Sequence, residues 1–276
     1  MCHDAPVLEC VVNISEGRDE SVLAELARAG GADLLDVHRD PDHHRAVFTL
    51  VGTDAPRRIA SRAISSIDLR RHTGVHPRFG VLDVVPFVPL EGSTMADAVV
   101  ARDEFSTWLS ATADVPCFRY GPERSLPDVR RGAFTTLEPD TGPRLPHPTA
   151  GACAVGAREP LIAYNVWVTA PDLAAVRRVA AAVRSPAVRT LGLAVGNRYQ
   201  VSCNLVEPLV SGPKAVTDAV RAHGAACDVV VTGCELVGLL PRQVLESIDP
   251  DEWARLDLAE DRTIEARLAA RTPPPR

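Results

Sequence analysis

Ten residues, Arg71 to Gly80, carry the densest set of side chains able to do acid–base chemistry. The segment reads RHTGVHPRFG and contains two histidines, two arginines, two glycines and a proline. It runs directly into the apolar segment 81–90, which favours a buried strand. A polar loop held at the end of a rigid strand is a common way to build an active site. The segment is therefore the leading candidate for the functional site.

Within this segment, His76 is a better candidate for a general acid–base group than His72. Pro77 biases His76 toward extended backbone, and the following strand fixes its position. An imidazole titrates close to neutral pH and can both take up and release a proton there. The four-residue spacing would suit two metal ligands on a helix, but Gly74 and Pro77 disfavour a helix. A metal hydrolase remains a weaker alternative, with ligands drawn from His38, His43, His44, His72 and His76.

Two further segments could contact a ligand. Asn13 and Ser15 follow a β-branched run and could supply hydrogen bonds at the end of a strand, although helix capping explains them equally well. The segment 151–158 is rich in small residues, which permit close backbone approach at Gly156, and it ends in Arg158. It lacks the G-x-G-x-x-G spacing of a dinucleotide-binding loop.

Composition excludes several classes of protein. A net charge of −6 argues against a nucleic-acid-binding surface, because phosphate neutralisation needs a basic face. Seven cysteines without a C-x-x-C pair indicate neither a disulfide framework nor a zinc ribbon, and Cys153 and Cys203 are either nucleophiles or inert packing. The sequence has no signal-peptide pattern and no run of 18 apolar residues. We therefore expect a cytoplasmic protein that does not enter a membrane.

The order of the predicted elements gives the fold class. Strands and helices alternate as β-α-β-β-α-β in the first part of the chain, and the same order returns after a proline-rich connection over 121–149. This predicts an α+β protein with two subdomains, each a ferredoxin-like βαββαβ sheet with helices on one face. We expect the subdomains to span 1–157 and 158–276. The predicted strands are 7–13, 33–38, 45–52, 81–89, 115–120, 160–168, 190–195, 199–206 and 229–233, and the predicted helices are 21–28, 56–69, 95–112, 172–184 and 214–223.

The chain resembles the glutamate formimidoyltransferase family along almost its whole length. Five segments carry the resemblance, in the same order as in the family. They are ECVVNISEG at 9–17, HTGVHPRFGVLDV at 72–84, GACAVGAR at 151–158 with LIAYN at 161–165, QVSCNL at 200–205, and GCELVGLLP at 233–241.

The resemblance implies an activity. Members of this family transfer a formimino group from N-formimino-glutamate to N5 of tetrahydrofolate in histidine breakdown, and two α/β subdomains enclose the tunnel that binds the folate. Tetrahydrofolate would then be a co-substrate, and no metal is implied. The catalytic histidine of the family is the second one of its H-x-G-x-H-P-R motif, which is His76 in this chain. The resemblance also implies the stand-alone transferase form, without a cyclodeaminase domain.

The same resemblance places the binding residues. The carboxylates of glutamate and folate favour guanidinium partners, and three arginines lie in or beside the matched segments. The expected substrate and folate contacts are Asn13, Ser15, His38, His44, Arg45, Arg78, Gly156, Arg158 and Asn204.

Three positions differ from the family pattern. His38 stands where well-studied members have aspartate, His44 where they have asparagine, and Val75 where they have a charged residue. The leading hypothesis is therefore a folate-dependent transferase of a formimidoyl or formyl group. The alternative is a non-catalytic folate-binding protein or a homologue repurposed for another substrate. Sheet edges in such folds are often covered by a second copy, so we also expect a homodimer.

Overall fold

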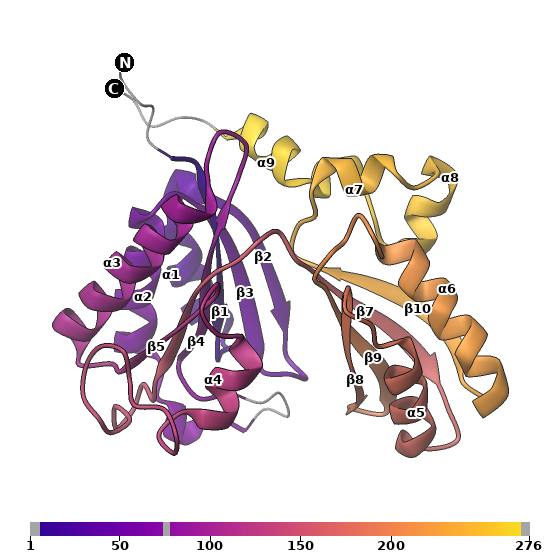
Figure 1. Ribbon diagram of the computed structural model, residues 1–276, viewed down its shortest axis with the longest axis horizontal. Coiled ribbons are helices and arrows are strands. Elements are labelled where there is room, and N and C mark those ends of the chain that lie inside the picture. Colours follow the sequence, from indigo (N-terminus) through magenta and orange to yellow (C-terminus); the bar gives the residue numbers. More distant parts are fainter. Residues whose placement is uncertain (1–5, 74–77, 272–276) are drawn as a thin grey trace. The chain divides into compact units, whose positions relative to one another are not determined.

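The computed structural model describes residues 6–73 and 78–271, and its chain forms two compact units (Figure 1). The first unit consists of the described residues up to Glu159 together with Arg271, and the second is Pro160–Ala270. The sequence predicts a division after residue 157, and the units divide after Glu159. Each unit is a sheet with helices, so the predicted α+β class with two subdomains is confirmed.

The first unit contains a six-stranded sheet in the order β2-β3-β1-β4-β6-β5. Strand β1 pairs antiparallel with both β3 and β4, and β6 pairs parallel with β4 and β5. The first four strands therefore have the predicted ferredoxin-like arrangement. The strands are β1 Leu8–Ile14, β2 Leu34–Asp40, β3 Arg45–Val51, β4 Leu82–Pro89, β5 Cys117–Tyr120 and β6 Cys153–Ala157.

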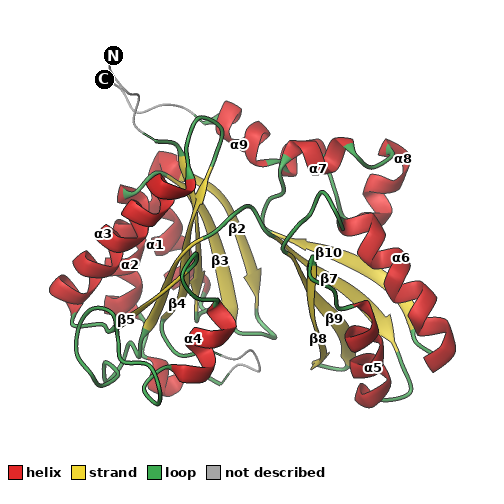
Figure 2. Ribbon diagram, in the orientation of Figure 1, coloured by secondary structure: helices red, strands yellow, loops and turns green. Residues whose placement is uncertain are grey.

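Three long helices cover one face of this sheet (Figure 2). Alternate residues of β1, from Leu8 to Ile14, are buried against them, as the two-residue period of a strand requires. Asp19 caps the first helix by accepting the N–H groups of Ser21 and Val22. The helices are α1 Glu20–Gly30, α2 Asp54–Ser66 and α3 Met95–Ala113.

The composition of the proline-rich segment 121–149 predicts a linker. The segment instead belongs to the first unit. It contains α4 (Leu126–Gly132), whose Val129 packs on the sheet face opposite α1, α2 and α3. A capping box between Ser125 and Asp128 starts the helix. The segment 151–158 likewise differs from prediction, because most of it forms the buried parallel strand β6.

The second unit repeats the topology with a four-stranded sheet in the order β10-β7-β9-β8. All neighbouring pairs are antiparallel, and α5 and α6 pack on the same face. The elements are β7 Ile162–Thr169, α5 Leu173–Val183, β8 Val188–Val195, β9 Arg198–Leu205, α6 Pro213–Gly224 and β10 Val230–Val237.

The C-terminal segment packs on this second unit. The buried hydroxyl of Tyr164 donates to the carbonyl of Leu256 at 2.7 Å, and Leu256 and Leu258 belong to the same core. The segment contains the short helices α7 Arg242–Glu246, α8 Pro250–Trp253 and α9 Ile264–Ala270. Short 3₁₀ turns lie at Gly31–Asp33, Leu69–Arg71, Ala225–Cys227, Ala254–Leu256 and Glu260–Arg262.

Two general features follow from the described residues. No helix within 6–73 and 78–271 is both long enough and apolar enough to cross a membrane. The cysteines of these residues are free thiols.

Candidate active site

The end of β1 holds the end of the Arg71–Gly80 motif. The hydroxyl of Ser15 donates to the carbonyl of Gly80 at 2.7 Å, and its backbone N–H donates to the carbonyl of Val81 at 2.9 Å. A side chain at Gly80 would bring its Cβ to 1.7 Å from the carbonyl oxygen of Ala152, so only glycine fits there. Ser15, one of the predicted contacts, therefore has a structural role as well.

The hairpin between β2 and β3 presents His43 and His44 beside the motif. Asp40 accepts the backbone N–H of His43 at 2.8 Å, and its other oxygen contacts the His43 ring. Burial alone would raise the pKa of Asp40, but the hydrogen bonds from His43 lower it to about 2. Asp40 is therefore ionised at neutral pH and holds the turn closed.

His44 links the hairpin to the motif. Its ring stacks on the ring of His72, with centroids 4.0 Å apart and planes 17° apart. His72 Nε2 lies 2.7 Å from the carbonyl oxygen of His44, and His44 Nε2 lies 3.0 Å from Glu16 Oε1. Three segments that are far apart in sequence therefore meet at one imidazole pair.

These side chains surround a small recess. Its volume is about 10 Å³, which is room for a single water-sized group. Burial lowers the pKa of Arg78 while the nearby Asp83 opposes the shift, and a guanidinium stays charged at neutral pH. The recess thus combines imidazoles, guanidinium groups and a carboxylate. Its lining is Ser15, His43, His44, Arg45, His72, Arg78 and Asp83.

The predicted contacts Asn13, His38 and Arg45 share one face of the sheet. His38 and Asn13 both lie opposite Val47 on neighbouring strands, and Arg45 is two residues before Val47 on β3. Residues directly opposite each other and residues two apart point to the same face. Of these three residues, Arg45 lines the recess together with Ser15, His44 and Arg78.

Gly156 and Arg158 lie farther along the same sheet. The backbone N–H of Arg158 donates to the carbonyl of Phe87, near the end of β4, whereas the recess lies at the start of β4 by Asp83. Four residues of strand separate these positions by about 13 Å. Gly156 has a packing role, because a Cβ there would lie 2.0 Å from the ring of Tyr120. As ligand contacts, both stay predictions.

Two further site residues are predicted from the sequence, Asn204 and His76. Asn204 is an exposed residue of β9 in the second unit, opposite Ala163 and Arg189. His76, the predicted acid–base group, lies outside the described residues.

The sequence pattern does not single out Asp83, although this residue lies at the recess. Asp83 lines the recess and its side chain is 3% exposed. The available signal was a single carboxylate inside an otherwise apolar strand, since a buried charge is retained only with partners.

The histidines and cysteines of the alternative chemistries can be compared only within the described residues. In 6–73 and 78–271 no three His, Cys, Asp or Glu side chains are grouped to bind a metal ion. Burial raises the pKa of Cys203 to about 12 and that of Cys153 well above its ordinary value, so both thiols are protonated at neutral pH.

Comparison with known proteins identifies similar sequences for both units. Residues 7–158 match the model of the formiminotransferase domain, N-terminal subdomain. The chain is 32% identical to a glutamate formimidoyltransferase of Streptococcus pyogenes, over 90% of this chain and 93% of that protein. It is 31% identical to a glutamate formimidoyltransferase of Thermoplasma acidophilum, over 87% of this chain and 89% of that protein.

Longer proteins match as well. The chain is 34% identical to a formimidoyltransferase-cyclodeaminase of Gallus gallus, over 87% of this chain. It spans about half, 51%, of the length of that relative.

Proposed function

This chain belongs to the formiminotransferase family, and we propose that it transfers a formimidoyl group between N-formimidoyl-glutamate and N5 of tetrahydrofolate, with His76 as general acid–base group. Relatives similar over nearly their whole length carry the name glutamate formimidoyltransferase, which supports this substrate pair. Tetrahydrofolate is a co-substrate in this proposal.

One observation carries the proposal within the structure. Predicted contact residues from three segments, Ser15, Arg45 and Arg78, line a single recess. Segments so distant in sequence converge on one place when the fold serves a site as well as a core. The recess has the positive charge that a carboxylate-bearing substrate requires.

The chemistry needs one mobile proton. The N5 amine attacks the amidine carbon, a new C–N bond forms, and a tetrahedral intermediate results. Its collapse breaks the bond to the glutamate nitrogen, which must gain the proton that N5 loses. His76 takes the proton from N5 and returns it to the leaving nitrogen, a task for an imidazole that titrates near neutral pH.

The arginines bind and orient the substrate. Guanidinium groups form paired, charge-assisted hydrogen bonds with carboxylates, and this fixes a substrate in place as well as binding it. We assign Arg45 and Arg78 to the carboxylates nearest the reacting carbon, since both line the recess. Arg158, about 13 Å along the sheet, suits a carboxylate at the other end of a long ligand.

A direct assay tests the proposal. Purified protein is mixed with tetrahydrofolate and N-formimidoyl-glutamate, and 5-formimidoyl-tetrahydrofolate is monitored. We expect turnover that His76→Ala removes and that His223→Ala, a change of an exposed histidine on α6, leaves intact. Tight folate binding without turnover would instead favour the non-catalytic alternative.

A further inference from the structure

We propose that Glu16 and His44 position His72, and through it Arg78 of the same recess, by means of a stacked imidazole pair. The inference deepens the proposed function and rests on it for its activity readout. Glu16 and His44 act through another side chain in this proposal, so they are positioning residues.

Glu16 is fixed as a hydrogen-bond acceptor. Its Oε1 accepts the backbone N–H of Arg18 at 2.7 Å and that of Asp19 at 3.0 Å. Burial alone would raise the pKa of Glu16, but these hydrogen bonds and the His44 ring lower it below its ordinary value. An ionised carboxylate only accepts, so the nitrogen that faces it, His44 Nε2, must carry a hydrogen.

His44 in turn fixes His72 in two ways. The carbonyl of His44 accepts a hydrogen bond from His72 Nε2 at 2.7 Å, and the two rings are stacked. The backbone N–H of His72 also donates to the carbonyl of Leu69 at 3.1 Å. Ring plane, ring nitrogen and backbone of His72 are thus each held by a separate contact.

The backbone conformation of His44 indicates that the surrounding contacts hold this residue in place. Its φ of 51° lies in the left-handed region, which is costly for most residues and less so for Asn, Asp and His. The His44 side chain is 12% exposed and that of Glu16 is 14% exposed. Such a conformation persists where the surrounding contacts hold it.

Charges around the pair limit its protonation. Burial lowers the pKa of His72, and the nearby His44 and Arg78 act in the same direction, while the His44 carbonyl and Glu16 oppose them. Two positively charged rings 4.0 Å apart would repel each other. The charged and titratable groups facing the pair are Glu16 and Arg18 after β1, Asp40 and His43 in the hairpin, Arg45 on β3, and Arg78 and Asp83 at the start of β4.

The pair lies beside groups that the reaction uses. Arg78 lines the same recess as His44 and His72 and is six residues from His72 in the chain. Displacement of His72 therefore disturbs the orientation of the bound substrate more than its affinity. Errors of orientation reduce the rate of the chemical step.

Two variants and a control test this by kinetics. Glu16→Gln removes the negative charge, and His44→Gln keeps an N–H for Glu16 but removes the ring and its proton. We expect each to lower kcat at least fivefold at pH 7.5, with KM changed less than twofold. The matched control is Glu20→Gln, four residues along, whose side chain is 77% exposed and which should leave kcat unchanged. A raised KM with unchanged kcat, or unchanged values for both variants, would overturn the proposal.

A second readout does not depend on turnover. The ring resonances of His72 are assigned by comparison with His72→Gln and followed by NMR as pH falls. We expect the titration midpoint of His72 to rise in His44→Gln, because a ring that buries His72 and lowers its pKa is removed. An unchanged midpoint contradicts the contact itself. If the wild-type protein shows no turnover but the midpoint of His72 still shifts in His44→Gln, the proposed function is rejected and the contact between His44 and His72 is retained.

Discussion

Asp83 at the start of β4 forms an ion pair with Arg130 of α4, with Nη2 and Oδ2 2.5 Å apart. The other carboxylate oxygen of Asp83 accepts the backbone N–H of Phe79 at 2.9 Å. The guanidinium of Arg130 also lies 5.8 Å from the centre of the Phe79 ring. The Asp83 carboxylate therefore connects the end of the Arg71–Gly80 motif to α4, which packs on the sheet face opposite α1, α2 and α3.

Asp83→Asn should destabilise the first unit by about 2–4 kcal/mol. Removing one partner of a buried ion pair leaves the other charge uncompensated, and the hydrogen bond to Phe79 is weakened as well. Denaturant unfolding measures the effect. The matched control is Glu138→Gln, which breaks the exposed pair with Arg144 and should change stability by less than about 0.5 kcal/mol. Equal effects of the two substitutions would contradict the role of Asp83.

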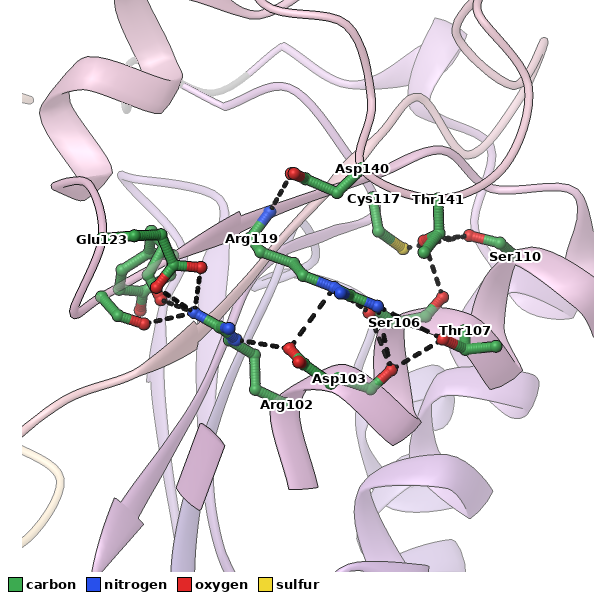
Figure 3. Close-up of polar contacts among 12 residues, drawn as sticks. Arg102, Asp103, Ser106, Thr107, Ser110, Cys117, Arg119, Glu123, Asp140 and Thr141 are labelled. Carbon is green, nitrogen blue, oxygen red and sulfur yellow. Dashed lines mark hydrogen bonds and ion pairs between the residues drawn. The ribbon is translucent and has the colours of Figure 1, made fainter. Parts of the chain in front are cut away.

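Arg102 should be essential for the packing of α3 on β5 (Figure 3). Its guanidinium, 5% exposed, donates to the carbonyls of Tyr120 and Gly121 and pairs with Glu123 and Asp103. Arg102→Met leaves those carbonyls without a donor, and we expect a loss of about 2–3 kcal/mol in thermal unfolding. Glu123→Gln should cost about 1 kcal/mol or less, because Glu123 is 47% exposed and keeps an acceptor. A larger loss of stability in Glu123→Gln would mean that the ion pair with Glu123, and not the hydrogen bonds to the two carbonyls, provides most of the stabilisation by Arg102.

Gly156→Ala should disturb the ring of Tyr120. The new Cβ would lie 2.0–2.5 Å from ring atoms of a side chain that is 6% exposed, so the core must shift. We expect about 1–3 kcal/mol of destabilisation from overpacking. The double variant with Tyr120→Leu should cost less than the sum of the single changes. If calorimetry shows that the effects of the two substitutions simply add, the Tyr120 ring is not the reason that position 156 requires glycine. Gly233→Ala, which meets no atom within 4 Å, is the control.

The stability of the folded protein should decrease as the pH is lowered. The pKa of His72 is lowered in the folded protein, so the unfolded chain binds the proton first and stability declines as pH falls below about 6.5. The pKa of Glu16 is lowered too, and its contribution is present above about 4.3 and is lost as pH falls further. Urea titrations from pH 8 to 4 measure this. His72→Gln should flatten the slope between pH 7 and 5, and an unchanged slope would contradict the assignment to His72.

The regular elements follow from sequence because their patterns are local. Helix α3 is predicted as 95–112 and observed as Met95–Ala113, and a capping box between Thr94 and Asp97 starts it. The repeat of the βαββαβ order is also predicted correctly. The short elements α4, β6, α7, α8 and α9 are not predicted, and α4 and β6 are missed for identifiable physical reasons. Prolines mask the capping box of α4, and β6 consists of small residues whose strand character depends on burial between β4 and β5.

The site is predictable only in part. The family resemblance predicts Ser15, Arg45 and Arg78 as ligand contacts, and the fold places all three at one recess. The ring stack of His44 on His72 depends on a left-handed turn at His44, which the sequence pattern does not indicate. The contact between Asp83 and Arg130 joins two segments 47 residues apart, one of which has the composition of a linker.

Transfer of a labelled carbon tests the central claim most directly. N-formimidoyl-glutamate with ¹³C in the formimidoyl group is incubated with tetrahydrofolate and the purified protein, and both products are followed by mass spectrometry. We predict labelled 5-formimidoyl-tetrahydrofolate in equal amount to the glutamate released, at a rate that His76→Ala lowers by at least 100-fold. Glutamate release without label in the folate, or no reaction at all, would contradict formimidoyl transfer as the function of this protein.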